Sequence, residues 1–201
     1  LVRGLELKEA NGGTVTVLNV GGADSDPVIR KALAIGADTA VRIDAETTDA
    51  LYVAKQIANY VKEQGFDMVL SGKETIDYNG SQIGGMVAEL MDAPYVSLAS
   101  KLEMDGNTAT IEREVEGGVE VIEVNTPFVL SAAKGMAEAR IPNMRGIMAA
   151  RSKPLTVVPA SEATTSTTIK GFSLPPEKTG CKYVDTAEEL VELLRNEAKA
   201  I

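Results

Sequence analysis

The sequence predicts an α/β protein with a mostly parallel, doubly wound sheet, a small antiparallel meander, and a C-terminal arm followed by a helix. Up to Ala93, short β-branched runs alternate with segments of helical periodicity, which is typical of βα units. From Pro94 to Val124 polar and apolar residues mostly alternate, which indicates antiparallel strands. The Thr/Ser/Pro-rich stretch from Thr156 to Pro176 is too long for an internal connection, so we expect an arm laid on a partner.

The first half of the chain is expected to contain three strands, each followed by a helix. Leu1 to Lys8 has the pattern of the end of a helix whose start precedes the sequence, so targeting signals cannot be judged. Pro27 near one helix start, and Gly36 and Gly65 after two helix ends, are typical helix boundaries. The strands are expected at Thr14 to Val20, Thr39 to Ile43 and Asp67 to Leu70, and the helices at Asp26 to Ile35, Asp49 to Gln64 and Ser81 to Met91.

Three strands of the meander follow, joined by turns rich in glycine. The turns are Asp105-Gly106-Asn107 and Glu116-Gly117-Gly118, which suit tight hairpins. We expect Phe128 to Ser131 to return to the main sheet, because it is a short apolar run. The meander strands are expected at Val96 to Met104, Thr108 to Glu114 and Val119 to Val124.

The remaining chain shows weaker patterns. Met136 to Lys153 has only a weak helical pattern, whereas Thr186 and Glu189 form a capping box for a last helix. We therefore expect one domain at residues 1–155 and an arm with a helix at residues 156–201 that packs on a partner chain.

Composition excludes several classes of function. The 20 basic and 29 acidic residues give a net charge of -9, which disfavours nucleic-acid binding. Because the sequence has no His, Ser/His and Cys/His nucleophile pairs and His-containing metal sites are excluded within this chain, and we expect no metal site. Cys181 is the single cysteine and cannot form an internal disulfide, which favours a reducing compartment. No apolar run approaches the roughly 18 residues of a membrane span, so no membrane insertion is expected.

The most informative stretch is Ser71 to Gly85, which reads SGKETIDYNGSQIGG. It follows a buried strand and opens a helix, where backbone N–H groups and the positive end of the helix dipole can bind phosphate. Gly80 allows close approach, and Ser81 and Gln82 add side-chain donors. Alternatively, Ser81 is only a helix cap and the glycines serve packing. The stretch matches neither a Walker A loop nor GxGxxG.

A second cluster is the charged hairpin Ile111 to Ile122, followed by Thr126 to Ser131. By itself it could be a solvated ribbon, and it holds no reactive group. The cluster nevertheless resembles the signature of the electron transfer flavoprotein beta subunit. The residues that fit this signature in order are Ile111, Arg113, Glu116, Gly117, Gly118, Glu120, Pro127, Val129, Leu130 and Ser131.

Other segments resemble the same family. They are Ala32 to Asp38 (ALAIGAD), Ser71 to Asp77 (SGKETID), Ser97 to Glu103 (SLASKLE) and Glu138 to Lys153 (EARIPNMRGIMAARSK). The resemblance runs from about Leu5 to the C-terminus, and several spaced motifs together are much more specific than any one of them.

The resemblance implies an electron carrier and not an enzyme with its own bond-making chemistry. In this family FAD lies chiefly in the alpha subunit, which accepts electrons from acyl-CoA and related dehydrogenases, as in fatty acid oxidation, and passes them to a quinone reductase. The beta subunit has an adenine-nucleotide alpha-hydrolase-like fold with an N-terminal strand that this chain lacks. It buries a second nucleotide, usually AMP, which serves structure.

The resemblance also assigns site residues. The AMP phosphate is expected near Asp77, Gly80, Ser81, Gln82 and Ile83, where Ile83 offers only its backbone N–H. Tyr78 to Ile83 departs from the Gly-Asp-Thr-Ala-Gln-Val run of electron-bifurcating members, so AMP is favoured over a second FAD. In a further segment, Glu138 and Arg140 match residues that lie toward the alpha subunit near the flavin.

The resemblance leaves the dehydrogenase partner open. Pro159 to Ser166 occupies the place of the loop that docks dehydrogenases through a leucine, and this chain lacks that leucine. The alternatives are a bifurcating member with two FAD, or a stand-alone adenine-nucleotide module related to universal stress proteins. A cytoplasmic bacterial location is expected in preference to the mitochondrial matrix.

Overall fold

The computed structural model describes residues 1–47, 49–178 and 180–201, and these form two compact units, Leu1–Ile169 and Lys170–Ile201. The boundary expected at residue 156 lies inside strand β8 (Leu155–Pro159), which pairs with β2 (Thr39–Asp44) of the first unit. In the described part of the chain, no helix combines the length and the apolar character needed to cross a membrane.

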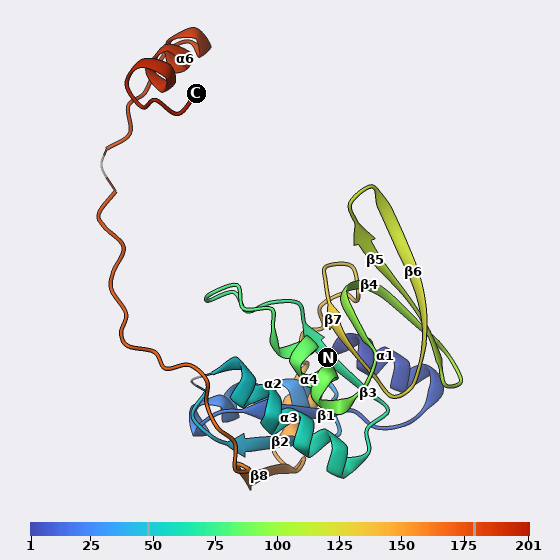
Figure 1. Ribbon diagram of the computed structural model, residues 1–201. Coiled ribbons are helices and arrows are strands. Elements are labelled where there is room, and N and C mark those ends of the chain that lie inside the picture. The colour runs from blue at the N-terminus through green and yellow to red at the C-terminus, as the bar shows by residue number, and fades with distance from the viewer. Residues whose placement is uncertain (48, 179) are drawn as a thin grey trace. The chain divides into compact units, whose positions relative to one another are not determined.

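The first unit is an α/β structure with two sheets, shown in Figure 1. One sheet has the order β1-β2-β8, with β1 at Thr16–Val20, and all its strands are parallel. The other has the order β3-β7-β4-β5-β6. Its strands are β3 (Met68–Gly72), β4 (Tyr95–Asp105), β5 (Thr108–Val115), β6 (Gly118–Asn125) and β7 (Phe128–Ala132).

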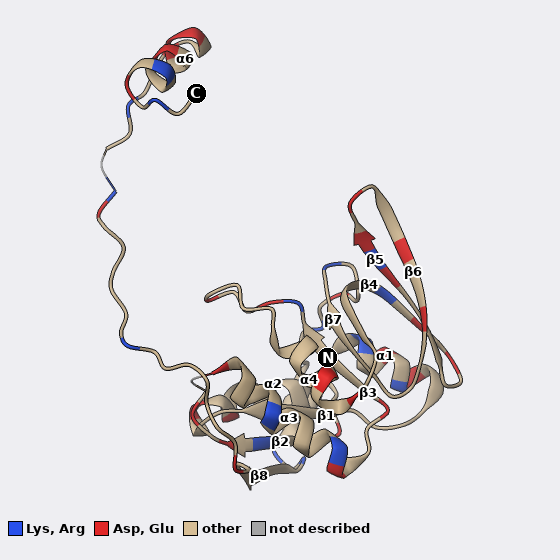
Figure 2. Ribbon diagram, in the orientation of Figure 1, with Lys and Arg blue, Asp and Glu red and all other residues tan. Residues whose placement is uncertain are grey.

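The second sheet is mixed, as the change of sequence pattern at Pro94 predicts. Strand β7 pairs in parallel with both β3 and β4, so the expected return of the chain to the parallel strands is confirmed. Strands β4, β5 and β6 are antiparallel, which confirms the meander. Figure 2 shows acidic residues along the β5–β6 ribbon, in agreement with its charged sequence.

The parallel strands form two sheets in the described residues, whereas the sequence predicts one. Within the described ranges, strand β1 pairs only with β2 and β3 pairs only with β7, so no ladder there joins β1 to β3. Most residues of β1 and β3 are accordingly half-buried, although they are largely apolar. The central strands β2 and β7 are buried along most of their length.

Six α-helices accompany the strands of the described chain. They are α1 (Val2–Asn11), α2 (Asp26–Ile35), α3 (Ala50–Gln64), α4 (Ile83–Met91), α5 (Met144–Ala150) and α6 (Ala187–Asn196), and a short 3₁₀ turn, η1 (Ala23–Ser25), precedes α2. Asp49 caps α3, since its side chain accepts a hydrogen bond from the N–H of Tyr52, and Gly65 ends α3 in the left-handed conformation.

Apolar burial holds the elements of the first unit together. Phe128, Leu102 and Ile111 are fully buried in the second sheet, where Leu7 of α1 packs against the same cluster. Each such side chain contributes roughly 1.5–3 kcal/mol by leaving water. A second cluster joins α2 to the first sheet, and a third joins α3 and α4 to β7. Helices α2, α3 and α4 are therefore each anchored to a sheet through buried apolar side chains.

The second unit consists of extended chain and α6. The Thr186 hydroxyl accepts a hydrogen bond from the N–H of Glu189 at 3.2 Å, which confirms the first half of the capping box. The Glu189 carboxylate accepts a hydrogen bond from the N–H of Asp185 instead of Thr186. Large apolar side chains of this unit are exposed, among them Phe172, Leu174 and Tyr183 at 93% each.

Candidate functional site

The loop between β3 and α4 is closed by hydrogen bonds at its base. The N–H of Thr75 donates to the carbonyl of Gly80 at 2.9 Å, and the N–H of Asn79 donates to the carbonyl of Thr75 at 2.9 Å. The N–H of Gly80 also donates to the Thr75 hydroxyl at 3.3 Å. Figure 1 shows this loop projecting from the body of the first unit. Asp77 and Tyr78 lie in the exposed turn that these bonds form.

Helix α4 begins two residues later than the sequence predicts. Its N-cap is Gln82, which makes no side-chain capping bond, and the first helical residue is Ile83. The interpretation of Ser81 as the N-cap is therefore wrong, because the Thr75–Gly80 turn carries the chain to the helix one position further on. Ser81 and Gln82 are exposed just before the helix.

The start of α4 therefore offers the donors that a phosphate requires. No side chain of the described residues caps the helix, so its first N–H groups keep the partial positive charge of the dipole. The hydroxyl of Ser81 and the amide of Gln82 can donate beside them. Behind this surface, a Cβ on Gly84 would meet the hydroxyls of Ser71 and Tyr95 at 3.0 Å, so Gly84 allows α4 to pack closely.

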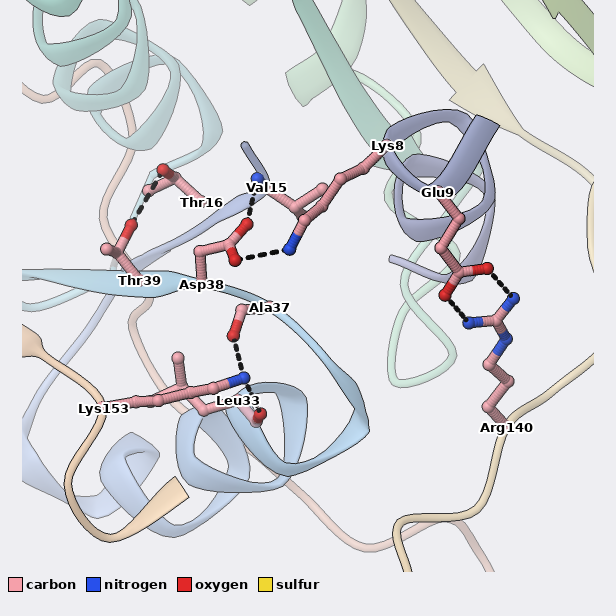
Figure 3. A network of polar contacts seen from close by, with 10 residues as sticks. All are labelled: Lys8, Glu9, Val15, Thr16, Leu33, Ala37, Asp38, Thr39, Arg140 and Lys153. Carbon is pink, nitrogen blue, oxygen red and sulfur yellow. Dashed lines mark hydrogen bonds and ion pairs between the residues drawn. The ribbon is translucent and has the colours of Figure 1, made fainter. Parts of the chain in front are cut away.

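A second group of candidate residues lies in the segment that follows β7. Arg140 forms a bidentate ion pair with Glu9 of α1, with N···O distances of 2.6 and 2.9 Å (Figure 3). The Arg140 guanidinium holds the pKa of the Glu9 carboxyl below its usual value. Glu138 is exposed and has no hydrogen bond or ion pair within the described ranges. No local sequence pattern indicates Glu9 as the partner of Arg140, because the two residues are 131 positions apart.

Glu138 and Arg140 line a cavity of ≈ 570 Å³. Its walls come from the start of α1, the ends of β3 and β7, and the segment Lys134 to Arg140. Asp77, Gly80, Ser81, Gln82 and Ile83 do not line it. The two groups are thus separate surfaces, connected through Ser71 and Gly72 at the carboxyl end of β3, which line the cavity and lead into the α4 loop.

The stretch after β8 is bound to α3, although the sequence predicts an arm laid on a partner. Gln56 hydrogen-bonds both the N–H and the carbonyl of Ser161 at 2.8 Å. The Asp49 carboxylate accepts hydrogen bonds from Ser166 and Thr167. These contacts explain why the first unit extends to Ile169.

The residues that the structure describes contain no group of three or more His, Cys, Asp or Glu side chains placed to hold a metal ion. Cys181 is exposed and unpaired.

The chain is an α/β protein with an uncapped helix start after a parallel strand, and its similarity to known sequences identifies its family. The sequence model described as "Electron transfer flavoprotein domain" matches residues 1–163. A relative from Bacillus subtilis, named electron transfer flavoprotein subunit beta, is 38% identical over 98% of this chain and 83% of its own length. Proteins of the same name from Syntrophomonas wolfei and Sus scrofa are 35% and 31% identical, over 97% and 90% of this chain and 80% and 74% of their own lengths. The chain belongs to the electron transfer flavoprotein family, among its beta subunits.

Proposed function

We propose that the chain acts in a heterodimer with an electron transfer flavoprotein alpha subunit and binds AMP as a structural nucleotide. The observation that carries the proposal is the uncapped start of α4, with Ser81 and Gln82 exposed beside its free N–H groups. Free N–H groups at a helix N-terminus bind phosphate in P-loop and dinucleotide-binding folds. No bond is made or broken by this chain, which is a carrier subunit and not an enzyme.

Each residue of the phosphate site has a distinct role in the proposal. Ser81 and Gln82 donate side-chain hydrogen bonds to phosphate oxygens, and Ile83 donates its backbone N–H. Gly80 lets the loop approach the ligand, and Asp77 lies in the exposed turn beside it. The backbone N–H groups supply most of the favourable interaction, since Ile83 has no side-chain donor.

Glu138 and Arg140 form the wall of this chain that faces the flavin of the alpha subunit. The FAD held there supplies reversible electron uptake. Exposed and unpartnered in the described chain, Glu138 is available to a cationic group of the other subunit, and Arg140 is held in place by Glu9. Electrons pass from acyl-CoA or related dehydrogenases through the flavin to a quinone reductase.

Pro159 to Ser166 is the surface that meets the dehydrogenase. Glu162, Thr164 and Thr165 are exposed and polar, and without a leucine this loop would recognise its partner by hydrogen bonds in place of an apolar anchor. We propose that the protein works in the bacterial cytoplasm, because the two bacterial relatives are more similar to this chain than the mammalian relative is.

Two experiments test the proposal. Co-expression with the alpha subunit of the same genome should yield a yellow heterodimer, whereas a colourless homodimer would favour a stand-alone nucleotide module. In the heterodimer, Gln82→Glu places a negative charge beside the phosphate, so the AMP content should fall about fivefold. The control is Gln64→Glu, at the end of α3. Equal AMP content in the two variants would overturn the site assignment.

A further inference from the structure

The segment Ser161 to Thr167, here called the α3-bound loop, is fastened to α3 at both ends. At its first end, Gln56 is only 2% exposed and makes three hydrogen bonds to Ser161. The Gln56 amide nitrogen donates to the Ser161 carbonyl at 2.8 Å, and its oxygen accepts from the Ser161 N–H at 2.8 Å and hydroxyl at 3.0 Å. Asn59, one turn along the helix, donates to the same hydroxyl at 3.0 Å. Both polar atoms of the Gln56 side chain thus bind the same residue.

Asp49 holds the other end of the loop. One carboxylate oxygen accepts from the N–H groups of Ser166 and Thr167, both at 2.6 Å, and from their hydroxyls at 2.8 and 3.1 Å. The other oxygen caps α3 through the N–H of Tyr52 at 3.0 Å. The Tyr52 N–H, followed by the groups of Ser166 and Thr167, holds the pKa of Asp49 far below its usual value although the side chain is buried. Asp49 is therefore ionised at neutral pH.

The two anchors fix the path of the loop. Asp49 and Gln56 are roughly 10 Å apart along the helix axis. Because Ser161 is bound near Gln56 and Ser166 near Asp49, the loop runs along α3 in the direction opposite to the helix. Between the anchors, the only hydrogen bonds to the loop in the described structure come from Lys55, whose ammonium lies 3.4 Å from two oxygens of Thr164. The middle of the loop is thus presented to solvent from two fixed ends.

We propose that Asp49 and Gln56 are positioning residues that hold the α3-bound loop in its docking conformation before a dehydrogenase arrives. This inference rests on the proposed function, in which Pro159 to Ser166 is the docking surface. A loop whose ends are already ordered loses less conformational entropy on docking than a free one. The role is distinct from capping, because the cap uses one oxygen of Asp49 and the loop uses the other.

Two variants separate the loop contacts from the rest of α3. Asp49→Asn keeps an oxygen that can cap α3 and turns an amide toward the loop donors, and Gln56→Leu removes all three bonds to Ser161 at similar volume. Glu63→Gln is the matched control, since Glu63 is exposed on the same helix and has no contact with the loop among the described residues. All are made in the complete heterodimer with its FAD. If Asp49→Asn fails to fold, Gln56→Leu tests the proposal independently.

Amide hydrogen exchange measures the order of the loop directly, and the measurement needs no dehydrogenase. The amide protons of Ser161, Ser166 and Thr167 donate directly to the two side chains. Gln56→Leu should speed exchange at Ser161, and Asp49→Asn at Ser166 and Thr167, each by about tenfold or more, while Glu63→Gln changes neither. Unchanged exchange at all three amides would overturn the proposal.

Steady-state kinetics then measures docking. The assay uses an acyl-CoA dehydrogenase that reduces the unmodified heterodimer. The KM for the heterodimer should rise about fivefold in both variants at unchanged kcat, because only the ordering cost of docking changes. A loop variant, Glu162→Lys with Thr165→Lys, tests docking at this surface directly. If the loop variant raises KM and the two α3 variants do not, positioning is overturned and docking stands. If none of the three changes KM, the docking surface is wrong and the inference fails with it.

Discussion

Glu9 and Arg140 join α1 to the segment after β7 through two hydrogen bonds, 131 positions apart in the sequence. The pair raises the pKa of Arg140 and lowers that of Glu9, so both groups keep their charges. Arg140 lines the cavity that Glu138 also lines, whereas Glu9 does not. A side chain outside the sequence motifs thus orients the arginine that the proposal places near the flavin.

Glu9→Gln should loosen Arg140 without removing it. If Arg140 supports the flavin site, FAD should dissociate about threefold faster from the heterodimer, because an unsupported arginine holds its geometry less well. The measurement is the recovery of flavin fluorescence on dilution. Glu63→Gln, on the distant helix α3, serves as the control for loss of one acidic charge. Equal rates in the two variants would place Arg140 away from the flavin.

Lys153 stabilises the end of α2. Its ammonium group donates to the carbonyls of Leu33 at 3.0 Å and Ala37 at 2.6 Å, as Figure 3 shows, and Arg30 of α2 donates in return to the carbonyls of Ala150 and Lys153. Lys153→Met should lower the free energy of unfolding by about 1–2 kcal/mol, since two charge-assisted bonds at a helix end are lost.

Chemical denaturation measures this loss. Lys31→Met, at an exposed position of α2, removes the same charge and should change stability by less than about 0.5 kcal/mol. A loss of similar size in both variants would mean that net charge, and not the contact with α2, is responsible.

Gly146 allows α5 to approach the backbone of α2. A Cβ at this position would lie 2.3 Å from the carbonyl oxygen of Ala34, which cannot move away as a flexible side chain could. Gly146→Ala should therefore destabilise the protein by about 1–3 kcal/mol, although alanine favours helix more than glycine does. Gly72→Ala, where a Cβ meets nothing within 4 Å, is the control in a thermal unfolding series. Higher stability of Gly146→Ala would show that α5 does not pack in this way.

The ionisation of the Asp38 carboxyl should make the stability of the protein depend on pH. Burial would raise its pKa, but the Lys8 ammonium at 2.5 Å and the Val15 N–H at 2.8 Å together lower it, as Figure 3 illustrates. A lowered pKa in the folded state stabilises the protein above the unfolded value of about 3.9, and this stabilisation is lost as the pH falls through the folded pKa.

The comparison of wild type with Asp38→Asn isolates this charge. At pH 7 the variant should be less stable by about 1 kcal/mol, and the difference should shrink steadily below about pH 4. Denaturant unfolding at a series of pH values measures it. A difference that is constant with pH would show that the charge of Asp38 contributes nothing.

The sequence was most informative where local chemistry decides structure. Pro27, Gly36 and Gly65 marked helix ends correctly, and the glycine turns at Gly106 and Gly117 have the positive φ angles that tight hairpins require. The start of α4 was misplaced because the hydrogen bonds between Thr75 and Gly80 shift it.

Long-range contacts could not be predicted in the same way. Gln56 and Asp49 have the ordinary pattern of a helix face and a helix cap, and nothing local indicates partners more than a hundred positions away. The same holds for Glu9 and Arg140. The division into two sheets also depends on which strands pair. The apolar patterns of β1 and β3 would be the same whether or not these strands paired with each other, so the sequence does not distinguish one sheet from two. The resemblance to a family supplied the site residues that local physics left open.

The nucleotide content of the purified heterodimer tests the central claim most directly. Denaturing the complex and quantifying the released nucleotides by chromatography and mass spectrometry should give one FAD and one AMP per heterodimer. Two FAD with no AMP would contradict the structural AMP site and would indicate an electron-bifurcating protein. One FAD with no second nucleotide would contradict the phosphate site at the start of α4.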